Sequence, residues 1–399
     1  MFDEKKLHKY ADVIIWALKL ARKNKFKKHD TVLVNFEKDA LLLAEIVHEK
    51  LAKEKIHTII SMLPTAKISK DFFANADDIM LKNIPAGRPQ FIKSLNGYIV
   101  LRATEDLLSL KNIKPKKLTT ATIAKKKIRD IMNKREQTGD FGWTLANFPT
   151  NNMAKTAKLS LKEYSNQIEK ACFLNEKDPV KKWKSVVAKI HNIEKWLNGL
   201  KIDTLYMKSK NTDLEIKLGK DRKFIGGRGA NIPSFEIFIS PDHRYTKGIY
   251  FADLPSYING NYVKNLKLEF HQGKVVNLKA DEGEEFARKM IFMDEGSCQL
   301  GEFSLTDTRF SKINKFMADT LYDENFGGKN GNSHIALGSS YTDTYTKNPA
   351  TLNKKKQKEL GFNNSALHWD IINTEKKIVK AKLKNGKIIT IYENGKFKH

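Results

Sequence analysis

The sequence predicts two domains, an α/β domain with a helical extension over residues 1–202 and a mixed α+β, mostly antiparallel domain over residues 203–399. Three observations lead to this fold class. The 399 residues are enough for two domains. Apolar strands alternate with amphipathic helices in roughly the first hundred residues, which is typical of a parallel sheet covered by helices. After Ile202 the pattern changes to short β runs, followed near the C-terminus by Asn-Gly turns that favour hairpins.

The elements of the first domain follow from the spacing of its apolar residues. In chain order we expect a helix over 5–25, a strand over 31–34, a helix over 39–53, a strand over 58–62, a helix over 70–81 and a strand over 97–101. From residue 118 to 199 the pattern is mainly helical, with an interruption over 141–148, and Pro179 marks the first turn of a long helix. No GxGxxG fingerprint or Walker loop is present, so we predict no nucleotide site in this domain.

The sequence of the second domain has the pattern of short strands that is typical of an antiparallel sheet. Strands are expected at 204–207, 214–218, 249–251, 266–270 and 275–278. The turns Asn385-Gly386 and Asn394-Gly395 predict a C-terminal tail of hairpins. The acidic run from Asp281 to Glu285 indicates the start of a helix rather than a metal site.

Composition restricts the class of protein. No apolar run is long enough to span a bilayer, and the first residues do not form a signal peptide. The two cysteines, Cys172 and Cys298, lie far apart and outside any CxxC pair, which argues against a disulfide framework or a cysteine zinc site. We therefore expect a cytoplasmic protein with no membrane partner.

The net charge of +26 raises the alternative of nucleic-acid binding. Only 10 of the 72 basic residues are arginine, whose planar fork suits base and phosphate recognition better than lysine does. The lysines are scattered through every segment, which favours a solvated lysine-rich surface. We predict no specific nucleic-acid partner, although non-specific adhesion to polyanions is expected at low salt.

Several separate motifs of the second domain carry metal-ligand chemistry. In His368-Trp369-Asp370 an imidazole and a carboxylate project from the same face if the segment is a strand. Glu236 and Glu302 each adjoin apolar runs, where a carboxylate needs a partner because an unpaired buried charge is costly. His334 opens a small apolar strand and could be a metal ligand. Two carboxylates, two histidines and an aspartate in one domain are what a dinuclear site requires.

An acidic cluster precedes His334. The run Asp323-Glu324-Asn325 leads into a glycine-rich loop, and its acidic residues could simply cap a turn. Other metal motifs fail, since His48-Glu49 begins like HExxH but Ala52 occupies the position of the second histidine.

The motifs together resemble a known family. Asn-x-Pro-Ser-x-Glu, Leu-Gly-Glu, Asp-Glu-Asn followed by His-Ile-Ala-Leu-Gly, and His-x-Asp are similar to those of the thermophilic metallo-aminopeptidases of the aminopeptidase T and aminopeptidase S type. The order and spacing of the motifs fit, and the segment Trp143 to Ala154 also resembles the family. The resemblance implies a hydrolase that removes N-terminal amino acids from short peptides, and it implies a homodimer.

The resemblance also implies a metal site of two divalent ions in the C-terminal domain. Glu236 would bridge both ions, Glu302 and His334 would bind one, and His368 and Asp370 would bind the other. Oxygen and imidazole ligands without a thiolate suit zinc, cobalt or manganese, and sequence does not choose among them.

Two residues are expected to take part in catalysis. Glu302 is the candidate general base, and Tyr341 matches a family tyrosine whose phenol would stabilise the oxyanion or touch a metal. The chain departs from the family pattern at Phe235, where a glycine commonly precedes the glutamate, and this ring could narrow the pocket. A basic nucleic-acid-binding protein, or a metal-binding protein on a decayed peptidase scaffold, remains the alternative.

Overall fold

The computed structural model describes residues 2–399 and divides the chain into two compact units. The first comprises Met1–Ile113, Ala124–Val186 and Arg228–Ser234, and the second comprises Lys114–Ile123, Val187–Gly227 and Phe235–His399. The boundary expected near residue 202 stays a prediction.

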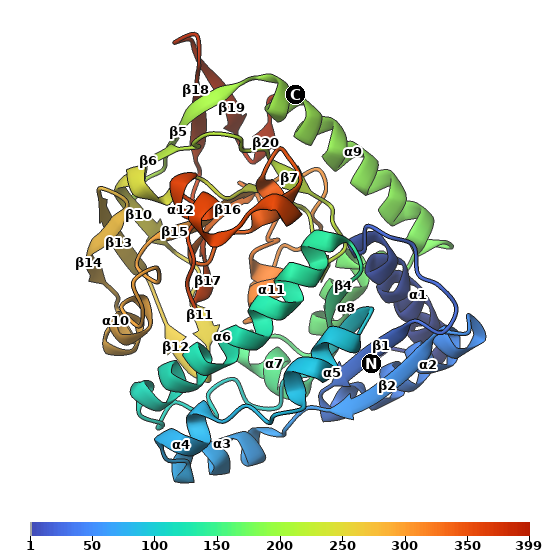
Figure 1. Ribbon diagram of the computed structural model, residues 1–399. Helices are drawn as coiled ribbons and strands as arrows, with labels where there is room; N and C mark the ends of the chain where they lie inside the picture. Colours follow the sequence, from blue (N-terminus) through green and yellow to red (C-terminus); the bar gives the residue numbers. More distant parts are fainter. Residues whose placement is uncertain (1) are drawn as a thin grey trace. The chain divides into compact units, whose positions relative to one another are not determined.

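The first unit is built on a parallel sheet of five strands in the order β2-β1-β3-β4-β8 (Figure 1). Its strands are β1 (Thr31–Phe36), β2 (His57–Met62), β3 (Gly97–Arg102), β4 (Gly142–Asn147) and β8 (Asn231–Ile232). This confirms the predicted alternation of strands and helices. The interruption predicted over 141–148 is the strand β4, in the interior of the sheet.

Helices cover both faces of this sheet. Helices α1 (Glu4–Ala21) and α2 (Leu41–Lys53) contact the sheet strands, and α1 also packs on α2. An apolar cluster on Leu33 includes Ile92 of α5 (Arg88–Ser94) and Ile128 of α6 (Pro115–Thr138). Because successive residues of a strand point to opposite faces of the sheet, neighbouring side chains of β1 pack against different helical layers.

The remaining helices agree with the sequence prediction apart from one division. The helix expected over 70–81 forms as α3 (Ala66–Asn75) and α4 (Asp78–Lys82), because the Asp77 side chain accepts the Met80 amide and starts a new helix. The other helices are α7 (Asn151–Thr156), α8 (Leu161–Ala171) and α9 (Pro179–Gly199). Within residues 2–399, no helix has the length and apolar character that crossing a membrane requires.

The second unit contains two larger antiparallel sheets. The eight-stranded sheet has the order β14-β13-β10-β6-β5-β18-β19-β20. Its strands are β5 (Ile202–Lys208), β6 (Asp213–Lys217), β10 (Lys247–Ala252), β13 (Leu266–His271), β14 (Lys274–Lys279), β18 (Ile378–Leu383), β19 (Ile388–Glu393) and β20 (Lys396–Phe397). The predicted C-terminal hairpins are confirmed as β18, β19 and β20.

The second large sheet has five strands in the order β17-β16-β15-β9-β7 and is called the ligand sheet below. Its strands are β7 (Ile225–Gly226), β9 (Glu236–Ile239), β15 (Leu300–Thr306), β16 (Asn332–Gly338) and β17 (His368–Asn373). The Tyr250 hydroxyl on β10 lies 3.1 Å from the Ser333 carbonyl and 2.9 Å from the Ile371 carbonyl, which ties the two sheets together.

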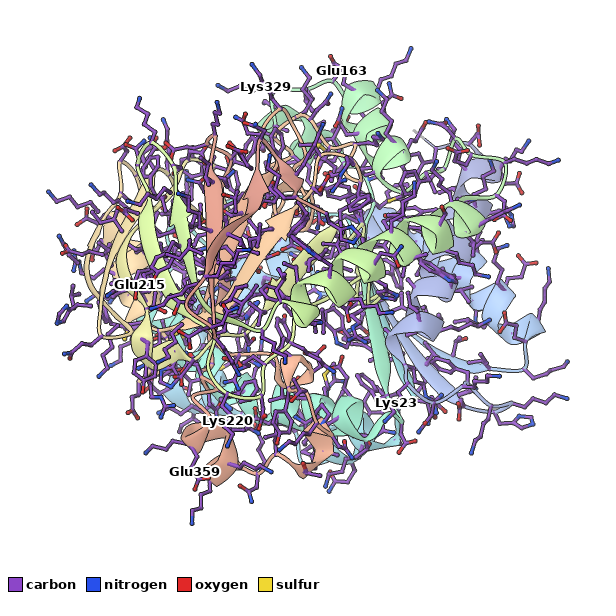
Figure 2. The ribbon with its side chains drawn as sticks, turned by 90° about the horizontal axis from the view of Figure 1, so that it is seen from above. Lys23, Glu163, Glu215, Lys220, Lys329 and Glu359 are labelled. Atoms are coloured by element: carbon purple, nitrogen blue, oxygen red, sulfur yellow. The ribbon has the colours of Figure 1, made fainter. Side chains whose placement is uncertain are left out.

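Smaller elements complete the second unit. They are the ribbon of β11 (Ser256–Ile258) and β12 (Asn261–Val263), and the helices α10 (Glu284–Ile291), α11 (Thr320–Asp323) and α12 (Lys354–Glu359). Helix α10 confirms the helix start predicted from the acidic run. The three lysines labelled in Figure 2, Lys23, Lys220 and Lys329, are exposed, as expected for scattered surface lysines.

Candidate metal centre

The predicted site residues meet on one face of the ligand sheet. The antiparallel register places Glu302 of β15, Ala336 of β16 and Asp370 of β17 in one cross-strand row. His334 lies two residues before Ala336 and therefore shares its face, and His368 shares the face of Asp370 for the same reason. The sheet thus converts residues that are distant in sequence into neighbours.

Small residues on the central strand β16 leave room above this face. Ala336 separates Glu302 from Asp370, and Gly338 is the register partner of His368. A methyl group and a hydrogen atom allow side chains of the flanking strands to meet, so Nε2 of His368 lies 3.8 Å from Oε2 of Glu302.

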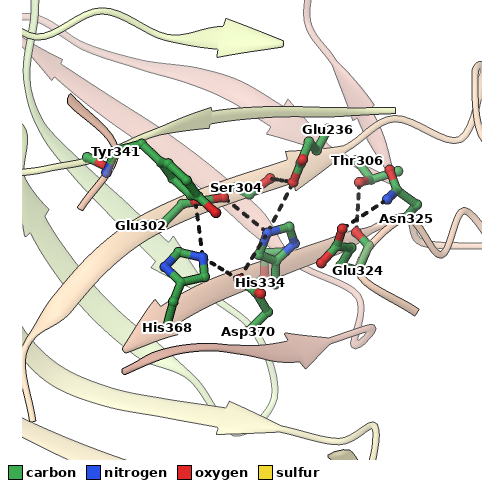
Figure 3. Close-up of polar contacts among 12 residues, drawn as sticks. Glu236, Glu302, Ser304, Thr306, Glu324, Asn325, His334, Tyr341, His368 and Asp370 are labelled. Carbon is green, nitrogen blue, oxygen red and sulfur yellow. Dashed lines mark hydrogen bonds and ion pairs between the residues drawn. The ribbon is translucent and has the colours of Figure 1, made fainter. Parts of the chain in front are cut away.

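His334 lies at the centre of the cluster (Figure 3). Its Nε2 is 3.2 Å from Oε2 of Glu236, 3.3 Å from Oε1 of Glu302 and 4.0 Å from Oδ1 of Asp370. Nε2 of His368 is 3.4 Å from the same oxygen of Asp370. The structure therefore brings together all five predicted ligands.

Glu324 also belongs to this cluster, although the sequence reasoning did not select it. Ligand atoms of Glu324, His334 and Asp370 lie within 4.8 Å of one another, and the same is true of Glu236, Glu302 and His334. Asp323 does cap a turn, since its carboxylate accepts the amides of residues 317 and 319. The acidic run before the glycine-rich loop was the sequence signal that pointed to Glu324. Of its two acidic residues, Asp323 caps the turn and Glu324 joins the ligand cluster.

Asn325 connects the two acidic sides of the cluster. Its Oδ1 accepts the Phe235 amide directly before Glu236, and its Nδ2 lies 3.5 Å from Oε1 of Glu324. Phe235 is fully buried, so its ring offers no exposed surface to a ligand.

Aromatic rings border the cluster beside His368. The Tyr341 ring centroid is 4.8 Å from that of His368 and 5.6 Å from that of Phe238, and Tyr341 keeps 37% of its surface exposed. Desolvation and the negative charges of Glu302 and Asp370 raise the pKa of the Tyr341 phenol well above its ordinary value. The phenol therefore remains a neutral hydrogen-bond donor near pH 7.

The metal-free cluster attracts protons. Burial works to lower the pKa of His334, but its hydrogen bonds to Glu236 and Glu302 outweigh burial and raise that pKa well above the ordinary value. Burial likewise opposes charging of His368, but the charge and hydrogen bond of Asp370 raise the pKa of His368 to about 9.

The carboxylates are shifted by the same forces. Burial raises the pKa of Glu302 to about 7, against the opposing effect of His334. Burial and the charges of Glu236 and Asp370 raise the pKa of Glu324 well above its usual range. The pKa of Asp370 is lowered because the charge of His368 outweighs burial. A buried group of acids that shares protons in this way is an environment that stabilises added cations.

Four carboxylates and two imidazoles without a thiolate are donors that suit a hard or borderline divalent metal. Such a set of donors is typical of metal-dependent enzymes. Comparison with known protein families identifies the family of this chain. The family described as "thermophilic metalloprotease (M29)" matches residues 3–397, and the chain therefore belongs to it.

Relatives with assigned names are aminopeptidases. Aminopeptidase PepS of Streptococcus thermophilus is 30% identical over 242 residues, which cover 58% of this chain and 57% of the relative. Aminopeptidase AmpS of Bacillus subtilis is 27% identical over 328 residues, covering 77% of this chain and 78% of the relative. Aminopeptidase T of Thermus thermophilus is 27% identical over 268 residues, covering 64% and 63%. The match thus spans less than two thirds of PepS and of aminopeptidase T.

The fold has a solved counterpart in wild-type AmpT from Thermus thermophilus. The TM-score is 0.79 at 21% identity, and the match covers 98% of this chain and 99% of AmpT. This shows the mixed α/β fold. The predicted family resemblance is confirmed, and the names of the relatives support the prediction of an aminopeptidase hydrolase.

Proposed function

We propose that the protein is a metal-dependent aminopeptidase that removes N-terminal amino acids from short peptides. The observation that carries this proposal is the convergence of four carboxylates and two imidazoles on one face of the ligand sheet, in the C-terminal domain. The membership of the chain in a metalloprotease family, and the aminopeptidase names of its relatives, support the same function.

The donor set fits two divalent cations. Four buried or half-buried carboxylates carry a formal charge of −4 when ionised, which two divalent ions would balance. Glu236 would bridge the ions, Glu302 and His334 would hold one, and His368 and Asp370 would hold the other. Glu324 would be a sixth ligand. Zinc, cobalt or manganese suits these oxygen and nitrogen donors.

The bound ions would acidify a water molecule and polarise the peptide carbonyl. Glu302 would accept the proton of that water and pass it to the leaving amine. Tyr341 would donate a hydrogen bond to the developing oxyanion, because its neutral phenol borders the ligand face.

Removal of the metal tests this function directly. We expect purified protein to release amino acids from dipeptides and from aminoacyl reporter substrates, and a strong chelator should abolish the release. Zinc, cobalt or manganese added after removal of the chelator should restore it. Full turnover in protein shown by elemental analysis to be metal-free would contradict the proposal.

Metal affinity should rise with pH. In the metal-free protein His368, with a pKa of about 9, and Glu302, with a pKa of about 7, hold protons that an incoming ion must displace. Between pH 6 and 8 the affinity should increase by about tenfold per pH unit for each proton displaced. Calorimetry in buffers of different ionisation enthalpy measures the protons released, and a Kd independent of pH would contradict the proton-holding cluster.

Three further assignments are proposals that extend this function. We propose a homodimer, as the family resemblance implies. Helix α3 has no buried residue and exposes Ile68 and Phe72 as apolar surface, which supports a contact with a second copy. The free cysteines Cys172 and Cys298 support a reducing, cytoplasmic location. A domain boundary at Ile202 is supported by the start of β5, the first strand of the eight-stranded sheet in chain order.

A further inference from the structure

Three strands of the ligand sheet meet at the end that carries His368. Strand β15 begins at Leu300, β16 ends at Gly338 and β17 begins at His368. Leu300 pairs with Leu337, and Gly338 pairs with His368, so these strand ends are adjacent. The relative position of the side chains on β15, β16 and β17 depends on how this end is held.

Asn363 joins the segments that continue from the three strand ends. Its Nδ2 donates to the Gly338 carbonyl at 2.6 Å and to the Gly296 carbonyl at 2.7 Å, and it lies 3.5 Å from the Gln299 carbonyl. Its backbone amide donates to the Ser340 hydroxyl at 2.9 Å, and its carbonyl accepts the Ser340 amide at 2.9 Å. The residue is only 6% exposed, so its hydrogen bonds are shielded from competing water.

These contacts continue into the metal centre through Ser339. The Ser339 carbonyl accepts a hydrogen bond from Nδ1 of His368 at 3.0 Å, which leaves Nε2 directed at the carboxylates. A ligating histidine is commonly oriented by such a bond from its other nitrogen.

Close packing holds this carbonyl in place. A Cβ atom on Gly301 would lie 2.5 Å from both the Gly338 and Ser339 carbonyl oxygens, so only glycine permits the approach. Gly301 lies at the β-bulge that precedes Glu302. The hydrogen bonds of Asn363 to Gly338 and Ser340 therefore hold both neighbours of the Ser339 carbonyl.

We propose that Asn363 is a positioning residue for the second metal position, the one assigned to His368 and Asp370. The proposal rests on the proposed two-metal function. The hydrogen bonds of Asn363 go to residues other than the proposed ligands. Asn363 fixes the Ser339 carbonyl, which in turn orients the His368 imidazole. His334, assigned to the first metal position, lies four residues before Gly338 on β16, so we expect that position to depend less on Asn363.

The test compares two variants by calorimetric titration of metal-free protein with Co²⁺. Asn363→Asp keeps the shape of the side chain, removes both N–H donors and turns an oxygen toward three carbonyls. Asn373→Ala is the matched control, because Asn373 is fully buried at the other end of β17 and donates to the Phe251 carbonyl. Melting temperatures of both variants measure the general loss of stability.

We expect wild type to bind two ions. In Asn363→Asp one of the two positions should lose about 10–100-fold in affinity, the range typical of lost outer hydrogen-bond partners, while the other position changes less than about threefold. The variant should also lose kcat more than KM. Asn373→Ala should keep two ions despite a comparable fall in melting temperature.

Two results would overturn the proposal while leaving the two-metal function in place. One is an Asn363→Asp variant that binds both ions as wild type does. The other is an equal loss at both positions that Asn373→Ala reproduces, which would indicate general destabilisation. A wild-type protein that binds a single ion would instead overturn the two-metal function itself, and the positioning role with it.

Discussion

Replacement of Glu302 by glutamine is expected to lower kcat by about 10²–10⁴-fold, the range of a lost general base. Glutamine keeps the size of the side chain but cannot accept a proton from water. Glu302 is 3% exposed and its Oε1 lies 3.3 Å from Nε2 of His334, so its carboxylate faces the cluster rather than solvent. Turnover of an aminoacyl reporter at saturating metal measures the loss.

The stability of the same variant separates catalysis from folding. Burial of an ionised carboxylate costs free energy, and burial is the main reason that the pKa of Glu302 is raised to about 7. Metal-free Glu302→Gln should therefore melt at or above the temperature of metal-free wild type at pH 8. Glu359→Gln, an exposed change at the end of α12, should leave turnover unaltered. Wild-type turnover in Glu302→Gln would remove Glu302 from the mechanism.

The fold class followed from patterns that are local in sequence. The alternation of strands and helices before residue 102 identified the parallel sheet, and the Asn-Gly turns identified the terminal hairpins. The division of one expected helix into α3 and α4 depended on the side-chain cap of Asp77, a local contact that competes with helical periodicity. Strand β4 was not selected because predominantly helical sequence surrounds it.

The centre itself was only partly accessible from sequence. The period of two in a strand placed His368 and Asp370 on one face without any structure. Glu324 was not separable from Asp323, because adjacent acids look alike until one is seen to cap a turn and the other to face His334. The roles of Ala336 and Asn363 arise from register and from contacts across loops, which no local pattern carries.

Replacement of His334 by alanine is expected to weaken metal binding, most at the position assigned to Glu302 and His334. His334 belongs to both groups of three ligands, and its Nε2 lies within 4.0 Å of three carboxylates. The loss should exceed the roughly 10–100-fold caused by loss of an outer hydrogen-bond partner, because a donor to the ion itself is removed. Turnover at micromolar metal should fall in parallel. Titration with Co²⁺ measures the affinity, and His243→Ala, a histidine outside both groups, is the control.

The stability of metal-free His334→Ala at different pH values gives a second, independent test. Because the pKa of His334 is raised well above its ordinary value, its positive charge offsets the surrounding acids at neutral pH. Because the pKa of His334 in the folded protein lies above its ordinary value of 6.5, the stability that its charge contributes is fully present below pH 6.5 and falls as pH rises from there, so the stability deficit of the variant relative to wild type should shrink between pH 6.5 and 8. Thermal melts in the presence of a chelator measure this. An affinity for Co²⁺ equal to wild type, with a pH-independent difference in melting temperature, would show that His334 serves packing alone, since only a ligand and charge partner links metal binding to the protonation of its neighbours.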